Sequence, residues 1–169
     1  VEITTTARQM AKVMLSETEN IAPTPLGPSL SSAVEEVQNT YPDAVVTPAA
    51  AVPETLVQAN NMLEAVFRNL LKNAIQHNDK EIPEVDVSAR ERTDSVLVQI
   101  ADNGPGIPDT EKETIFGKGE TGLDSSGTGL GLYLVKTLVE SYGGSIELDD
   151  NDPVGANFSV TVPKAGSRQ

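Results

Sequence analysis

Apolar residues recur at helical spacing in four stretches of the chain. Their steps of three and four predict helices over residues 1–19, 28–40, 62–77 and 128–142. In the third stretch apolar pairs return every four positions, which marks one buried face. Asn61 followed by Glu64 fits a capping box at the start of this helix, and Gly143-Gly144 fits the end of the fourth.

Strict alternation of apolar and polar residues predicts strands elsewhere. Val85, Val87 and Ala89 alternate with polar residues, and a second alternating run over 96–100 follows a turn at Thr93-Asp94, so these two form a hairpin. Shorter strand candidates lie at residues 20–26, 44–47, 55–58, 145–148 and 157–162. The last two close a second hairpin around residues 151–153.

The order of these elements predicts the fold class. Strands and helices are interspersed over residues 20–164, which favours an α/β fold: a two-layer sandwich of a mixed sheet with about three helices on one face. Pro23, Pro25 and Pro28 mark a linker and an edge strand at its start. No periodicity persists over residues 108–126, which predicts a mobile loop.

The N-terminal helix that precedes this domain has two interpretations. Ile3, Ala7, Met10 and Met14 form a short heptad seam over residues 1–19. Two heptads are too few to form a stable helical pair alone, so the helix either packs on its own domain or is the end of a longer dimerisation helix.

Composition excludes some classes of partner. A chain of 169 residues suits one domain, and its 25 acidic against 12 basic residues give a net charge of −13, which disfavours nucleic acid. Only seven residues are lysine. An acid-rich, lysine-poor surface is similar to those of proteins from salt-loving organisms, but ordinary acidic domains share the trait, and both alternatives stay open.

The sequence also carries signals about the compartment and about membrane contact. There is no cysteine, so disulfides and thiol chemistry are excluded. No apolar run approaches membrane-spanning length and no signal peptide opens the chain. We expect a soluble, cytoplasmic segment with no direct membrane contact, and a membrane anchor further upstream stays open.

Three short segments carry the candidate chemistry. Asn69 and Asn73 lie one helical turn apart, so their carboxamides project side by side. Asp102 ends an apolar strand ahead of a glycine turn that runs to Ile107. Residues 127–132 read Gly-Thr-Gly-Leu-Gly-Leu and open a helix, where unpaired amides can bind phosphate. Each segment alone is ordinary: two surface amides, a surface turn and a flexible connection.

In this order and spacing the segments resemble the N, G1 and G2 boxes of the histidine-kinase-type ATP-binding fold, the GHKL superfamily, also known as the Bergerat fold. Ile115-Phe116 lies between the second and third segments, as the F box of that family does. The resemblance covers roughly residues 20–164 and implies ATP and Mg²⁺ as cofactors. It also implies that residues 1–19 are the end of a dimerisation helix and that residues 165–169 form a disordered tail.

The resemblance assigns roles to individual residues. Asn73 is the expected Mg²⁺ ligand, Asn69 supports the phosphate and metal end, and the Asp102 carboxylate accepts the exocyclic amine of adenine, which selects ATP over GTP. His77 is expected to line the ribose or phosphate edge. Residues 108–126 would form the ATP lid. The remaining expected contacts are Gly104, Gly106, Ile107, Phe116 as lid anchor, Lys118 at the terminal phosphate, and Gly127, Thr128, Gly129, Leu130 and Gly131 around the phosphates.

One residue separates the possible activities. ATP-hydrolysing relatives carry glutamate where this chain has Asn69, and an amide cannot accept a proton from water. The resemblance therefore implies the catalytic domain of a sensor histidine kinase, which passes the γ-phosphate to a histidine on its own dimerisation domain in a homodimer and from there to a response regulator receiver domain. His77, the only histidine, is not the expected acceptor. A hydrolytic relative and a non-catalytic scaffold are the alternatives.

Overall fold

The structure is a computed structural model that describes residues 21–112, 115–116, 131–151 and 154–166. Its main sheet has five strands in the order β2-β4-β5-β7-β6, of which only β2 and β4 pair in parallel. A separate two-stranded sheet pairs β1 with β3. The strands are β1 (Ala22–Pro25), β2 (Val45–Thr47), β3 (Leu56–Ala59), β4 (Glu84–Glu91), β5 (Ser95–Asp102), β6 (Ser145–Asp150) and β7 (Ala156–Pro163).

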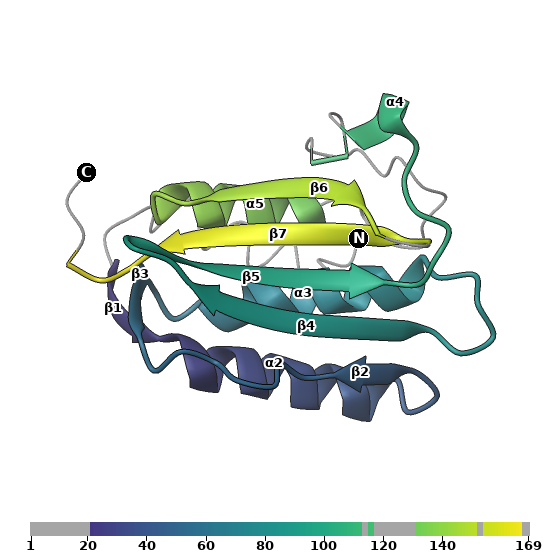
Figure 1. Cartoon of the computed structure of the whole chain (residues 1–169), viewed down its shortest axis with the longest axis horizontal. Helices are drawn as coiled ribbons and strands as arrows, with labels where there is room; N and C mark the ends of the chain where they lie inside the picture. The colour runs from purple at the N-terminus through teal and green to yellow at the C-terminus, as the bar shows by residue number, and fades with distance from the viewer. Residues whose placement is uncertain (1–20, 113–114, 117–130, 152–153, 167–169) are drawn as a thin grey trace, which may run out of the picture.

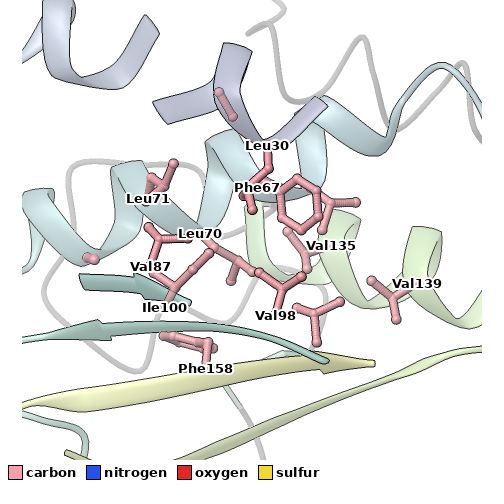
Figure 2. Close-up of a cluster of buried hydrophobic side chains, with 14 of the residues drawn as sticks. Leu30, Phe67, Leu70, Leu71, Val87, Val98, Ile100, Val135, Val139 and Phe158 are labelled. Atoms are coloured by element: carbon pink, nitrogen blue, oxygen red, sulfur yellow. The ribbon is translucent and has the colours of Figure 1, made fainter. Parts of the chain in front are cut away.

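Three helices cover one face of the main sheet (Figure 1). They are α2 (Leu26–Thr40), α3 (Leu63–Gln76) and α5 (Gly131–Ser141). Figure 2 shows the core between the layers, where Phe67 of α3 and Phe158 of β7 are fully buried with aliphatic side chains from the other elements. The predicted two-layer α/β sandwich with a mixed sheet is confirmed.

The opposite face of the sheet is polar, because residues alternate along each strand. In β4, Val85 and Val87 are buried under the helices while Asp86 and Ser88 are exposed. The predicted hairpin between β4 and β5 is present, and the N–H of Arg92 donates to the Ser95 carbonyl at 2.8 Å to close it.

Two helix starts differ from the sequence prediction. Helix α2 begins at Leu26, so Pro28 lies in its first turn, where a missing N–H costs nothing. Helix α3 begins at Leu63 without a side-chain cap from Asn61, so the predicted capping box is wrong. The turn before the helix is held instead by Asn60, one residue before Asn61. The Oδ1 of this buried residue accepts the Met62 N–H at 3.0 Å.

A short helix lies inside the stretch that was expected to be a loop. Helix α4 (Asp109–Lys112) follows Pro108, whose carbonyl accepts the Glu111 N–H at 2.9 Å. None of its four residues is buried, so it carries no apolar period that could reveal it. Figure 1 shows α4 outside the two layers.

Helix α5 ends as predicted at Gly143-Gly144. Gly143 has a φ of +88°, and the N–H of Gly144 reaches back to the Val139 carbonyl at 3.0 Å, which is a Schellman ending. The expected start of this helix at residue 128 and the helix over residues 1–19 lie outside the described residues. At the other end of the chain, the Ala165 N–H donates to the Leu56 carbonyl at 2.8 Å, so this residue is attached to β3.

None of the helices described here is long and apolar enough to cross a membrane.

Candidate functional site

A cleft opens where β5 ends, between α3 and the first residues of β7. Three segments distant in sequence meet there, since its lining residues are Asn73, His77, Asp102, Pro105, Gly106, Ile107, Ala156 and Phe158. The structure therefore brings the second asparagine of the first segment and the acid of the second segment into one cavity.

Asp102 is a buried acid that lines this cleft. The residue is only 7% exposed, and its Oδ1 accepts the N–H groups of Gly104 at 2.9 Å and Ala156 at 3.1 Å. Burial raises the pKa of the carboxyl, and the two N–H groups and nearby positive charge oppose that rise only in part. Among the described residues nothing donates to Oδ2, so one oxygen of the carboxylate is left for a ligand.

The loop after Asp102 turns back on the cleft. Gly104 is close to the carboxylate, where a Cβ would lie 3.2 Å from Oδ1. Gly106 has a φ of +80°, which side chains rarely adopt, and Ile107 is buried beside it. Gly106 is therefore required by this backbone path, and Gly104 lies where a side chain would be tightly packed.

Asn103 ties the same loop to the connection between α3 and β4. Its Oδ1 accepts the Asn78 Nδ2 hydrogen at 2.8 Å and the Glu84 N–H at 2.9 Å. Sequence reasoning passed over this residue, although an asparagine between an acid and a glycine is a common turn former.

Helix α3 supplies the polar wall of the cleft. His77 is the C-cap residue of α3, and its N–H donates to the Asn73 carbonyl at 3.2 Å. Burial lowers the pKa of the His77 imidazole, and the nearby Asp102 partly counteracts this. Gln76 faces away from the cleft, because its Nε2 donates to the Tyr41 hydroxyl at 2.8 Å.

Asn69 lies against the start of α5 instead of lining the cleft. Its Nδ2 donates to the Ala65 carbonyl of the same helix at 2.7 Å, which directs the side-chain oxygen outward. A Cβ on Gly131 would lie 3.3 Å from that oxygen. The first and third sequence segments therefore meet at Asn69 and Gly131. Lys118, Gly127, Thr128, Gly129 and Leu130 lie outside the described residues.

Phe116 packs on the wall of the cleft. Its ring stands edge-on to Phe158 with centroids 6.0 Å apart, and Ile115 beside it is 1% exposed. The predicted packing of Phe116 against the core is confirmed, and it contacts a residue that lines the cleft.

Sequence reasoning missed the contribution of β7. Ala156 and Phe158 line the cleft, but nothing in the local pattern of residues 156–163 shows that this strand pairs with β5. The only signal for these residues is the apolar alternation of β7. It places both of them on the face of the sheet that the helices cover, where the cleft lies.

Comparison with known proteins identifies the family of the chain. Residues 58–166 match the family described as histidine kinase-, DNA gyrase B-, and HSP90-like ATPase. The sensor histidine kinase DpiB of Escherichia coli is 38% identical over 105 residues, which are 59% of this chain and 19% of DpiB. The chain thus spans about a fifth of the length of such relatives.

Solved structures share the fold. A mycobacterial sensor histidine kinase, MprB, superimposes with a TM-score of 0.77 at 24% identity, covering 86% of this chain and 98% of the MprB chain. Full-length ShkA in complex with AMPPNP gives a TM-score of 0.72 at 21% identity, covering 100% of this chain and 41% of ShkA. With the family match spanning well over half of its residues, the chain belongs to the histidine kinase-, DNA gyrase B- and HSP90-like ATPases.

Proposed function

We propose that the chain binds Mg-ATP in this cleft and is the catalytic ATP-binding domain of a sensor histidine kinase. One observation carries the proposal: Asn73 and Asp102, 29 positions apart in the sequence, line the same cavity. The base would lie at the Asp102 end. A buried carboxylate whose second oxygen has no donor among the described residues accepts the exocyclic amine of adenine and repels the carbonyl that guanine presents there.

The phosphates would extend from the cleft toward α5. The oxygen of Asn69 faces Gly131, the first described residue of that helix, and the amides at the start of a helix favour anions. We keep Gly127, Thr128, Gly129, Leu130 and Lys118 as proposed phosphate contacts, His77 as the ribose or phosphate edge, and Gly104, Gly106 and Ile107 as contacts to the base.

The side chains present also fit a magnesium ion carried by the nucleotide. Within the described residues no three acids or histidines gather into a chelating cluster, so a metal here would need the nucleotide phosphates as ligands. Asn73 would supply the protein ligand, because a carboxamide oxygen is a hard, neutral donor. When bound, the ion would neutralise phosphate charge.

Transfer to a histidine suits this cleft better than hydrolysis. Asn69 cannot act as a base toward water, and its amide nitrogen is already used within α3. The acceptor we propose is a histidine on the dimerisation domain of the same protein, from which a response regulator takes the phosphate. Because ATP is a cytoplasmic substrate, we place the domain in the cytoplasm.

Phosphotransfer in trans tests this proposal. The chain is mixed with radiolabelled ATP, Mg²⁺ and a dimerisation domain that carries the acceptor histidine. We expect acid-labile label on that domain, no label on His77 and no steady release of phosphate. Label that accumulates on the chain itself, or continuous ATP turnover that Asn73→Ala abolishes, would instead favour a different reaction.

A further inference from the structure

The turn between β6 and β7 lies directly against the end of β5. The pairing of β5 with β7 ends with Ala101 opposite Asn157. One residue further on, the Ala156 N–H donates to Oδ1 of Asp102 at 3.1 Å. The first residue of β7 therefore helps to fix the orientation of the Asp102 carboxylate.

Asn151 holds the main chain of the same acid. Its Nδ2 donates to the Asp102 carbonyl at 2.8 Å, and its own N–H donates to the Gly155 carbonyl at 2.9 Å. The second bond closes the turn, and the first ties the closed turn to β5. Asp102 is thus held from one turn at two points, at its carbonyl by Asn151 and at its carboxylate by Ala156.

The turn is itself anchored on its outer side. Lys112 of α4 forms an ion pair with Asp150 at 2.8 Å, and it also contacts Asp109 within α4. The residue before Asn151 is therefore fixed to a neighbouring element. With Asp150 paired to Lys112 and its own N–H bonded to Gly155, Asn151 has a defined position from which to orient Asp102.

We propose that Asn151 is a positioning residue for the choice of nucleotide. The inference rests on the proposed function, in which Asp102 accepts the exocyclic amine of adenine. Asn151 is not among the residues that line the cleft, so it acts through Asp102. A hydrogen bond to adenine depends on the angle of the carboxylate, so a loosened Asp102 binds ATP less well and discriminates less against other purines.

The test is the ratio of affinities for Mg-ATP and Mg-ITP, measured by calorimetry. ITP carries a carbonyl where ATP carries the exocyclic amine, so it cannot donate to the Asp102 carboxylate but shares the ribose and phosphate contacts. In Asn151→Ala we expect ATP to bind about five- to tenfold more weakly, the loss typical of one hydrogen bond, with ITP unchanged. Asn151→Gln keeps the amide donor and should keep most of the preference.

Asn157→Ala is the matched control. It is the same substitution in the same hairpin, at a residue between the cleft-lining Ala156 and Phe158 but on the opposite face of the sheet. The ratio of its affinities for Mg-ATP and Mg-ITP should equal that of the unaltered chain. Circular dichroism on the same samples reports whether each variant is folded.

The outcomes separate the two claims. An unchanged ratio in Asn151→Ala, or equal losses for ATP and ITP, overturns the positioning role. If Asn151→Ala does not fold, the similarly sized Asn151→Leu decides, and failure of both to fold shows a purely structural residue and also overturns the inference. If the unaltered chain does not prefer ATP over ITP, the proposed function fails before Asn151 is tested.

Discussion

Gly155 lies so close to Asp102 that a Cβ added to it would come within 1.8 Å of the Asp102 carbonyl oxygen. Its φ of +113° also lies in a region that side chains rarely adopt. Gly155 therefore allows the β6–β7 turn to approach the candidate base-binding acid, and a side chain there would push the two apart.

Gly155→Ala should both destabilise the chain and remove nucleotide binding. We expect the free energy of unfolding to fall by about 3 kcal/mol or more, because backbone strain and a clash with main-chain atoms add. Urea denaturation measures this loss, and titration with Mg-ATP measures binding.

Gly166→Ala is the control for backbone strain alone. Gly166 has a φ of +86° but nothing within 4 Å of an added Cβ. The control should cost about 1 kcal/mol and leave ATP affinity unchanged. Equal losses in the two variants would contradict the assigned contact.

Asp102→Asn should bind no ATP yet be at least as stable as the unaltered chain at neutral pH. Burial raises the pKa of Asp102 above its ordinary 3.8, so the folded chain prefers the protonated acid and ionisation costs stability. The protonated carboxyl therefore contributes stability that is fully present below pH 3.8, the ordinary pKa. This stability is lost as the pH rises through the pKa of the folded chain.

Urea denaturation at several pH values checks this sign. The stability advantage of Asp102→Asn should shrink as the pH falls and the natural acid becomes protonated. A variant that loses stability most strongly at neutral pH would instead show that the ionised carboxylate stabilises the fold.

Asn73→Ala should remove the part of ATP affinity that depends on magnesium. Loss of a metal ligand is expected to weaken Mg-ATP binding about tenfold or more. Chelation of Mg²⁺ should then weaken ATP binding by the unaltered chain but have little effect on the variant. Lys72→Ala, next to Asn73 on α3, is the control, and chelation should weaken its ATP binding as it does in the unaltered chain. If chelation weakens ATP binding by Asn73→Ala to the same extent, Asn73 is not the ligand.

Tyr142→Phe should cost about 1 kcal/mol of stability, the typical net value of one hydrogen bond. The Tyr142 hydroxyl donates to Asn60 Oδ1 at 2.6 Å and is fully buried, which raises the pKa of the phenol. Urea denaturation measures the loss. Tyr133→Phe, a partly buried residue of α5, should change stability by less than about 0.5 kcal/mol.

Local patterns in the sequence predicted most of the fold. The period of α3 and the alternation in β4 and β5 arise from one buried face each, so they can be recognised without knowing the neighbours. Helix α4 was not predicted, because none of its residues is buried and it therefore has no apolar period. The predicted cap at Asn61 is absent. The turn before α3 is instead held by the side chain of Asn60, which also accepts the Tyr142 hydroxyl, a contact 82 positions away that no local pattern shows.

The candidate site was predictable only as far as its motifs extend. Asn73, His77, Asp102, Gly106 and Ile107 come from two short segments and do line one cleft. Ala156 and Phe158 join the site through the pairing of β7 with β5, which the residues around them do not reveal; their alternation shows only that they face the helices. Asn151 acts through the Asp102 main chain, a kind of contact that no sequence pattern records.

The most direct test of the central claim is calorimetric titration of the chain and of Asp102→Asn with Mg-ATP and Mg-GTP. If the three segments form one purine site read by Asp102, the chain binds ATP and not GTP, and the variant, although folded, binds neither. Equal affinity of the chain for both nucleotides, or undiminished ATP binding by Asp102→Asn, would contradict the account.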